Sequence, residues 1–181
     1  MVDNKIFCSN ASSKEALSTL MLRIKSKVSS SYSIAIFNLG NDDLDEMTLT
    51  MLLRCNSERV LILASDRVLR ILSAILPGSI FLFVSYKISL LSLTKIIKLL
   101  MISPKINPGS CSAVHLYNNA LTYTERVVLT HFIKGRSSEQ ISHMINYSKD
   151  DVETLISSSL KKLGVFNHNM LAHLGILLKI V

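Results

Sequence analysis

The last third of the chain carries three helix starts in close succession, each marked by a hydroxyl residue with a polar partner three positions later. They are Thr122 with Glu125, Ser137 with Gln140, and Ser148 with Asp151. In such a pair the hydroxyl accepts a hydrogen bond from a free backbone N–H, and the partner side chain reaches back. Apolar residues recur at helical spacing after each start, so the sequence predicts three short helices and a fourth from about residue 168.

The ends of these helices are marked as clearly as their starts. Gly135 and Gly164 close the first and third, where a left-handed residue is needed. Asn146 and Tyr147 form the turn between the second and third. The third helix is therefore predicted over 148–163, immediately after a tight turn.

Residues 1–103 alternate between short apolar runs and segments of helical spacing. The predicted strands are Lys5–Cys8, Tyr32–Leu39, Val60–Ala64 and Ile80–Val84. The predicted helices are Ser13–Val28, Leu44–Arg54, Arg67–Leu76 and Ser89–Met101. Continuously apolar strands between helices indicate a parallel sheet covered on both faces. A stretch rich in Pro, Ser and Asn over 104–117 is typical of a linker, and we expect 118–181 to form the helical domain.

Charge favours an anionic partner. The net charge is +7, but residues 1–105 contribute 13 Lys and Arg against 8 acids, and 106–181 contribute 7 against 5. The helical part is thus the less basic one. All five histidines lie in it, so its charge would rise at mildly acidic pH. Their spacing favours surface or packing roles over metal binding.

Other features exclude several classes of protein. The three cysteines, Cys8, Cys55 and Cys111, are far apart, which argues against a disulfide framework or zinc site and suits the cytoplasm. The uncharged run Ile71–Tyr86 is broken at Pro77 and is shorter than the roughly 20 residues that span a bilayer. We expect no membrane segment, no cofactor and no metal. No catalytic motif such as G-x-S-x-G or H-E-x-x-H occurs.

The segment Leu121–Val165 resembles the helix-turn-helix of the LuxR/FixJ (NarL-like) family of bacterial transcription regulators. The matching positions are Leu121-Thr122, Glu125, Gly135, Ile141, Ser148, Val152 and Lys162-Leu163-Gly164-Val165. The resemblance implies an all-α four-helix domain that is not an enzyme and whose third helix enters the major groove of double-stranded DNA.

The resemblance also implies a set of binding residues. The expected DNA contacts are Ser137, Lys149, Glu153, Thr154, Ser157, Ser158, Lys161, Lys162 and His168. The expected dimerisation residues, on the fourth helix, are Leu171, Leu174 and Leu178. It implies a homodimer, or a heterodimer with another LuxR-type regulator, and RNA polymerase as a further partner.

The third helix departs from the family in its charge. Asp151 stands where Thr is usual, and Glu153 where a basic residue is common; with Asp150 they place three carboxylates near the groove. A carboxylate can accept a hydrogen bond from cytosine but is repelled by phosphates. Two interpretations stay open. The chain is either a regulator that binds an unusual DNA sequence, or an auxiliary regulator that acts through a complete family member and has weak or no DNA binding of its own.

The arrangement of residues 3–101 is similar to the α/β receiver domain of response regulators, a flavodoxin-like fold. A working receiver needs acids after its first strand, a phosphorylatable Asp and a Lys. Here Cys8-Ser9-Asn10 follows the first strand, Asn38 stands near the Asp position, and Lys87 follows the last strand. We expect a degenerate receiver, independent of phosphorylation. The acids Asp42, Asp43 and Asp45 belong either to a solvated loop or to a metal or phosphate site.

Overall fold

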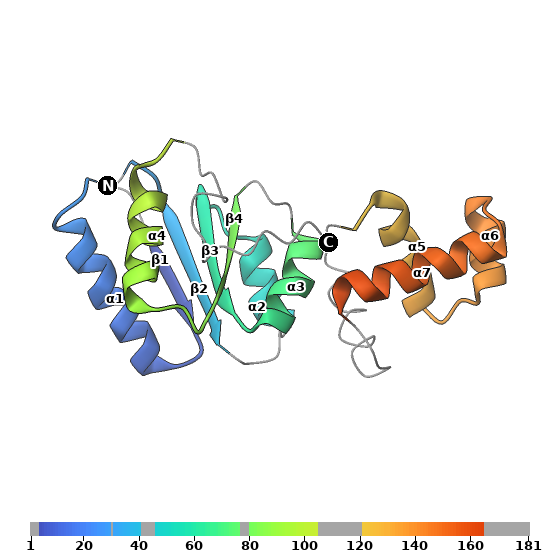
Figure 1. The fold of residues 1–181 in the computed structure, drawn as a ribbon, viewed down its shortest axis with the longest axis horizontal. Helices are drawn as coiled ribbons and strands as arrows, with labels where there is room; N and C mark the ends of the chain where they lie inside the picture. Colours follow the sequence, from blue (N-terminus) through green and yellow to red (C-terminus); the bar gives the residue numbers. More distant parts are fainter. Residues whose placement is uncertain (1–3, 30, 41–45, 77–79, 105–120, 165–181) are drawn as a thin grey trace. The chain divides into compact units, whose positions relative to one another are not determined.

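The computed structural model describes residues 4–29, 31–40, 46–76, 80–104 and 121–164. The chain forms two compact units, an α/β part and a helical part, and each is described by itself (Figure 1). The linker predicted over 104–117 lies almost wholly outside the described residues, so the domain boundaries remain predictions.

The α/β part is built on a parallel sheet whose strands lie in the order β1-β2-β3-β4. The strands are β1 (Lys5–Cys8), β2 (Ile34–Gly40), β3 (Arg59–Ala64) and β4 (Phe81–Ser85). Strand β3 is buried along its whole length, and β2 and β4 are buried over most of their apolar runs, as these runs predict. The four predicted strands are confirmed, with ends that differ by at most two residues.

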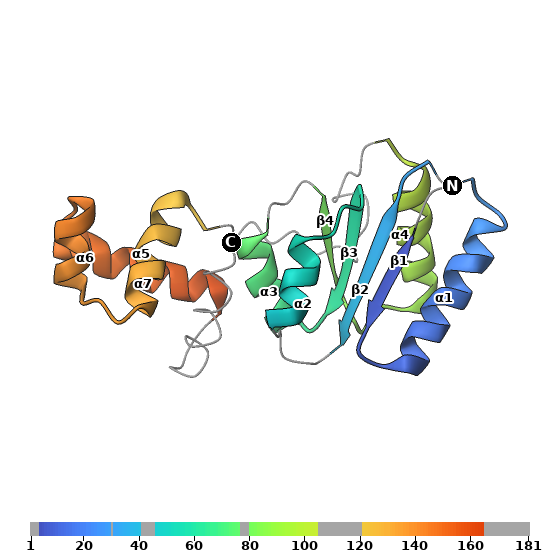
Figure 2. The same cartoon turned by 180° about the vertical axis from the view of Figure 1, so that it is seen from behind.

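Helices cover both faces of the sheet. They are α1 (Ala11–Lys25), α2 (Glu46–Leu53), α3 (Asp66–Ile75) and α4 (Leu90–Ile102). Figures 1 and 2 show α1 and α4 on one face and α2 and α3 on the other. Alternate strand residues such as Ile36 and Leu61 pack with Met21 of α1 and Ile97 of α4 in one cluster. The intervening strand residues face α2 and α3, as the alternation of side chains along a strand requires.

The first connection between strands, through α1, has the opposite hand to the next two, through α2 and α3. The steps from β1 to β2 and from β2 to β3 go the same way across the sheet, but α1 and α2 lie on opposite faces. Right-handed connections in a sheet of order 2-1-3-4-5 put the first helix on the face opposite the next three. Removing the second strand and the second helix from such a sheet leaves the arrangement seen here. The described sheet is therefore a receiver-like fold without that strand–helix unit.

The helical part contains α5 (Tyr123–Ile133), α6 (Ser138–Ile145) and α7 (Lys149–Leu163). Its core is a small apolar cluster with one or two residues from each helix: Val128, Ile141, Val152 and Ile156. The three helices predicted from the caps are confirmed, while the predicted fourth lies outside the described residues. Of the described helices, none is long and apolar enough to cross a membrane.

Candidate nucleic-acid interface

Two of the three helix starts are complete capping boxes. The Thr122 hydroxyl accepts from the Glu125 N–H at 3.2 Å, and the Thr122 N–H donates to Glu125 Oε2 at 2.8 Å. Ser137 and Gln140 repeat the arrangement at 3.2 and 3.0 Å. Each box satisfies two backbone N–H groups that the start of a helix would otherwise leave to water.

The third start, at Ser148, uses Asp151 differently. The Ser148 hydroxyl accepts from the Asp151 N–H at 3.1 Å and donates to Asp151 Oδ2 at 2.6 Å. Aspartate is one methylene shorter than glutamate, and here it bonds to the capping hydroxyl instead of the backbone. Asp151 therefore stabilises the start of α7, which accounts for an acid at this position without any contact with DNA.

A single left-handed residue, Asn146, sets the direction in which the chain enters α7. The C-terminal cap of α6 is Asn146, with φ 58°, and its N–H bonds back to the Ser142 carbonyl. Asn tolerates this left-handed conformation better than most residues. Only Tyr147 and Ser148 separate Asn146 from the first turn of α7, so α6 and α7 are held at a tight turn, as in a helix-turn-helix.

Helix α7 has one buried side and one exposed side. Val152, Ile156, Ser159 and Leu163 are buried. The exposed residues are Lys149, Asp150, Asp151, Glu153, Thr154, Ser157 and Lys161. Of the predicted DNA contacts on this helix, five thus share an accessible surface: Lys149, Glu153, Thr154, Ser157 and Lys161. We call these five residues the α7 face.

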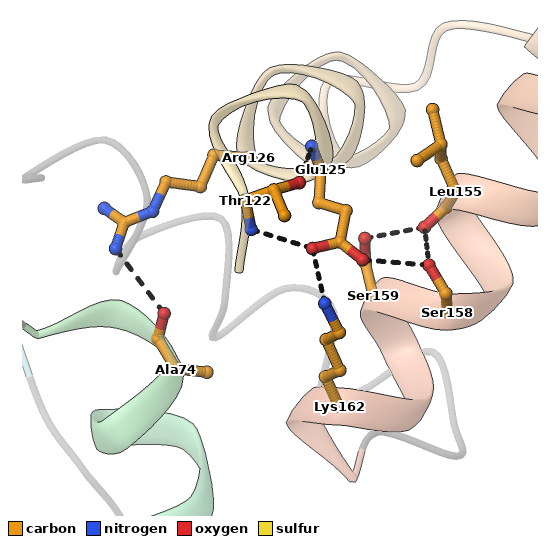
Figure 3. A network of polar contacts seen from close by, with 8 residues as sticks. All are labelled: Ala74, Thr122, Glu125, Arg126, Leu155, Ser158, Ser159 and Lys162. Atoms are coloured by element: carbon orange, nitrogen blue, oxygen red, sulfur yellow. Dashed lines mark hydrogen bonds and ion pairs between the residues drawn. The ribbon is translucent and has the colours of Figure 1, made fainter. Parts of the chain in front are cut away.

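Ser158 and Lys162, two further predicted DNA contacts, bond to Glu125 of α5 (Figure 3). The Ser158 hydroxyl donates to Oε1 at 3.0 Å, and Lys162 Nζ donates to Oε2 at 2.8 Å. The Glu125 side chain is only 6% exposed and that of Lys162 is 31% exposed. This ion pair holds α7 on α5, so the structure gives both residues a role within the domain and we leave them out of the α7 face.

Glu125 remains ionised in this setting. Burial alone raises the pKa of its carboxyl, but hydrogen bonds from Lys162, Thr122 and Ser158 together outweigh burial and leave the pKa below its ordinary value of 4.5. The sequence identified Glu125 only as half of a cap. The sequence does contain a signal for its second role. Ser158 and Lys162 are adjacent to Ser159 and Leu163, which belong to the buried side of α7, so both lie at the edge of the surface that packs on the rest of the domain.

A surface ion pair partly neutralises the acid that departs most from the family. Lys149 Nζ lies 4.0 Å from Glu153 Oε1, one helical turn along α7, with the two side chains 61% and 54% exposed. Such an exposed pair contributes little to stability. It does pair the carboxylate with a cation on the same face, which reduces the repulsion that Glu153 would meet near phosphates.

Other predicted residues lie elsewhere. Ser137 is exposed but serves as the cap of α6. His168 and the predicted dimerisation residues Leu171, Leu174 and Leu178 lie outside the described residues, so their roles remain predictions.

At the end of the sheet where a receiver holds its metal and phosphate, the described residues include Cys8 on β1, Asn38 on β2 and Asp66 directly after β3. Cys8 and Asn38 lie opposite each other at the ends of β1 and β2, and Asn38 Nδ2 donates to Cys8 Sγ at 3.6 Å. Lys87 Nζ lies 5.8 Å from the centre of the Tyr86 ring. Within the described ranges, no three His, Cys, Asp or Glu side chains are grouped so that they could hold a metal ion. The predicted acids Asp42, Asp43 and Asp45 lie outside those ranges.

Comparison with known proteins supports both parts of this description. Residues 119–174 match the family of bacterial regulatory proteins of the luxR family. RcsB from Salmonella enterica serovar Typhimurium, bound to promoter P1flhDC with the phosphomimetic BeF3−, is 20% identical over 98% of this chain and 100% of that one, with a TM-score of 0.51. RcsB dimers bound to two parallel DNAs give 19% identity over 94% and 95%, with a TM-score of 0.51. No curated protein sequence matches the chain.

These similarities establish the fold class: a parallel, receiver-like α/β part followed by a LuxR-type helix-turn-helix domain. The predicted fold class is thereby confirmed. The helix-turn-helix part is thus similar to that of bacterial regulatory proteins of the luxR family.

Proposed function

We propose that this chain is a bacterial transcription regulator that binds double-stranded DNA as a dimer through the α7 face and acts without phosphorylation of its receiver-like part. The observation that carries the proposal is α7 itself. It follows a tight turn, is anchored on α5 through Glu125, and presents five polar residues on its exposed side. This is the geometry with which a recognition helix enters the major groove.

The relatives support DNA and a second copy as partners. RcsB has been solved bound to promoter DNA and as dimers on DNA. For this chain we propose a homodimer, or a heterodimer with another LuxR-type regulator, that acts on RNA polymerase in the bacterial cytoplasm. The predicted dimerisation residues Leu171, Leu174 and Leu178 belong to this proposal.

Two roles are assigned within the α7 face. Thr154, Glu153 and Ser157 are proposed to read base edges, since a hydroxyl can donate or accept and a carboxylate can accept from cytosine N4. Lys149 and Lys161, together with Ser137 at the start of α6 and His168 beyond α7, are proposed to contact phosphates. Phosphate contacts fix the position of the domain and give binding its salt dependence.

Independence from phosphorylation is supported by the ends of β1 and β2. Cys8 and Asn38 bond to each other there, and an amide cannot form an acyl phosphate. A carboxylate is the group that receives the phosphoryl in a receiver, and the ion beside it needs oxygen ligands.

A second function is favoured by the acids of α7. Asp150 and Glu153 are exposed near the start of the helix, where like charge opposes the approach of phosphates. In this alternative the chain is an auxiliary regulator that pairs with a complete family member and binds DNA weakly or not at all alone.

Two neighbouring lysines test the proposal. We expect Lys161→Ala to weaken binding to any duplex DNA and to reduce the slope of log affinity against log salt by about 1, because one phosphate contact is lost. We expect Lys162→Ala to act first on stability, since Lys162 pairs with buried Glu125. Fluorescence anisotropy with a labelled duplex over a salt series, with urea unfolding in parallel, measures both.

Lys14→Ala is the matched control, because it removes the same charge from an exposed position on α1. An unchanged salt slope in Lys161→Ala, from a protein that binds DNA, would remove Lys161 from the interface. Absence of DNA binding by the folded parent protein would favour the auxiliary function.

A further inference from the structure

The turn between α5 and α6 carries an arginine whose side chain is held by a histidine. Arg136 Nη1 lies 3.0 Å from Nδ1 of His131, which is in the last turn of α5, and it also donates to the sulfur of Met144 on α6. An arginine has no acceptor, so the ring must accept this hydrogen bond at Nδ1. The contact therefore exists only while the ring is neutral.

Arg136 stands at the start of α6, next to a proposed DNA contact. It directly precedes Ser137, which caps α6 and is proposed to contact a phosphate. The Arg136 N–H donates to the His131 carbonyl at 3.2 Å, so the backbone of the turn is held by a bond that does not involve the ring. A change in the charge of the ring is therefore felt by the Arg136 side chain and not by the turn.

Protonation of the ring ends the contact. A charged imidazole has an N–H at both nitrogens, so Nδ1 no longer accepts. It also places a second positive charge beside a guanidinium that stays charged. Burial, followed by the charges of Arg136 and Lys134, lowers the pKa of His131 below its ordinary value of 6.5. The ring is thus neutral near pH 7 and takes up its proton in mildly acidic solution.

The charges of the neighbouring helices lie elsewhere. On α5 itself, Glu125 and Arg126 belong to the first turns, far along the helix from its last turn. On α6, Glu139 and His143 are exposed. On α7, Lys162 reaches α5 but pairs with Glu125. Among the described residues, the charges that act on the ring are those of the turn between α5 and α6.

We propose that Arg136 is a further phosphate contact of the DNA interface, held back by neutral His131 and released beside Ser137 when the ring is protonated. DNA binding then strengthens in mildly acidic solution. The proposal rests on the proposed function, because it needs DNA at the start of α6. A guanidinium is well suited to this contact, since its fork of N–H groups matches two phosphate oxygens.

The test is the salt dependence of DNA binding by the full chain, measured by fluorescence anisotropy with a labelled duplex at about pH 8 and about pH 5. We expect His131→Ala, which removes the acceptor, to steepen the slope of log affinity against log salt by about 1 already at the higher pH. Other histidines also gain charge on acidification. The steepening between the two pH values should therefore be larger by about 1 in the parent than in Arg136→Gln.

His143→Gln is the control variant, since it removes an exposed histidine from α6, and it should steepen as the parent does. Histidine ¹⁵N spectra give a readout without DNA. At the higher pH the His131 ring should carry its proton on Nε2, and Arg136→Gln should raise the pKa of that ring toward 6.5. Urea unfolding at both pH values verifies that each variant is folded.

Two results would overturn the inference while leaving the proposed function in place. One is the same slope for the parent and His131→Ala at the higher pH, and the other is equal steepening in the parent and Arg136→Gln. Absence of DNA binding by the folded parent at both pH values would overturn the proposed function, and this inference with it.

Discussion

His131 couples the charge of the helical part to pH. Burial, followed by the nearby cations Arg136 and Lys134, lowers the pKa of its imidazole below the ordinary value of 6.5. Arg136 Nη1 lies 3.0 Å from His131 Nδ1. An arginine can only donate, so the neutral ring accepts at Nδ1 and carries its proton on Nε2.

This lowered pKa predicts how stability depends on pH. Between the folded pKa and 6.5, the unfolded chain binds more protons than the folded one. The contribution of His131 to the free energy of unfolding is therefore complete above pH 6.5 and is lost as pH falls through that value toward the folded pKa. Urea unfolding between pH 8 and about pH 5 measures it.

His131→Gln should remove this part of the pH dependence, while His143→Gln, which alters an exposed residue of α6, should leave it in place. A stability that rises as pH falls through this range, or a slope that persists in His131→Gln, would contradict the assignment.

At the scale of elements, the attachment of α7 depends on one carboxylate. Glu125 caps α5 and bonds to both Ser158 and Lys162 of α7. We expect Glu125→Ala to lower the free energy of unfolding of the helical part by about 2 kcal/mol, because a cap is lost and two partly buried donors lose their acceptor. The loss should stay below that of a fully buried pair, since Lys162 can turn to solvent.

Chemical unfolding of Glu125→Ala and of Glu139→Gln measures this difference. Glu139 is an exposed acid in the first turn of α6, and its replacement should change stability by less than about 0.5 kcal/mol. Equal losses in the two variants would show that α7 is not held by Glu125.

The sequence predicted the elements of this fold well, for local reasons. Caps at Thr122, Ser137 and Ser148 are decided by residues three positions apart, and buried strands by unbroken apolar runs. The orientation of Ser158 and Lys162 was not predictable in that way, because it depends on where α5 places Glu125. Asp151 was recognised as a cap because its partner Ser148 is three positions away. The pairing of Glu153 with Lys149 is equally local, one helical turn along α7, but it was not predicted.

At the scale of the whole molecule, the order and hand of the strand connections were beyond sequence reasoning. The four strands are local features, but which edge of β2 receives β1 is decided by packing of α1 with α4 on one face. The resemblance to a receiver predicted the fold class, while the loss of the receiver's acids stays a prediction. It did not predict the absent strand–helix unit.

A receiver-like part with Asn38 and Cys8 at its strand ends should not respond to a phosphoryl analogue. We expect beryllium fluoride with Mg²⁺ to leave both the DNA affinity and the oligomeric state of the chain unchanged, because Asn38, whose amide cannot take the place of an aspartate, stands on β2 opposite Cys8. Anisotropy and analytical ultracentrifugation measure these two properties. RcsB from Salmonella enterica is the positive control, since it has been solved with this phosphomimetic. A gain in affinity that Asn38→Ala abolishes would contradict the expectation.

The central claim is that the folded chain reads DNA through the α7 face. Its most direct test is selection of random-sequence duplex DNA by the purified full chain at near-physiological salt, repeated with Thr154→Ala. We expect enriched duplexes to share a two-fold motif, and Thr154→Ala to relax the preference at one position of each half-site, at a cost of about 1–3 kcal/mol for the preferred base. No enrichment by a protein shown to be folded, or the same motif with the same strength from Thr154→Ala, would contradict the claim.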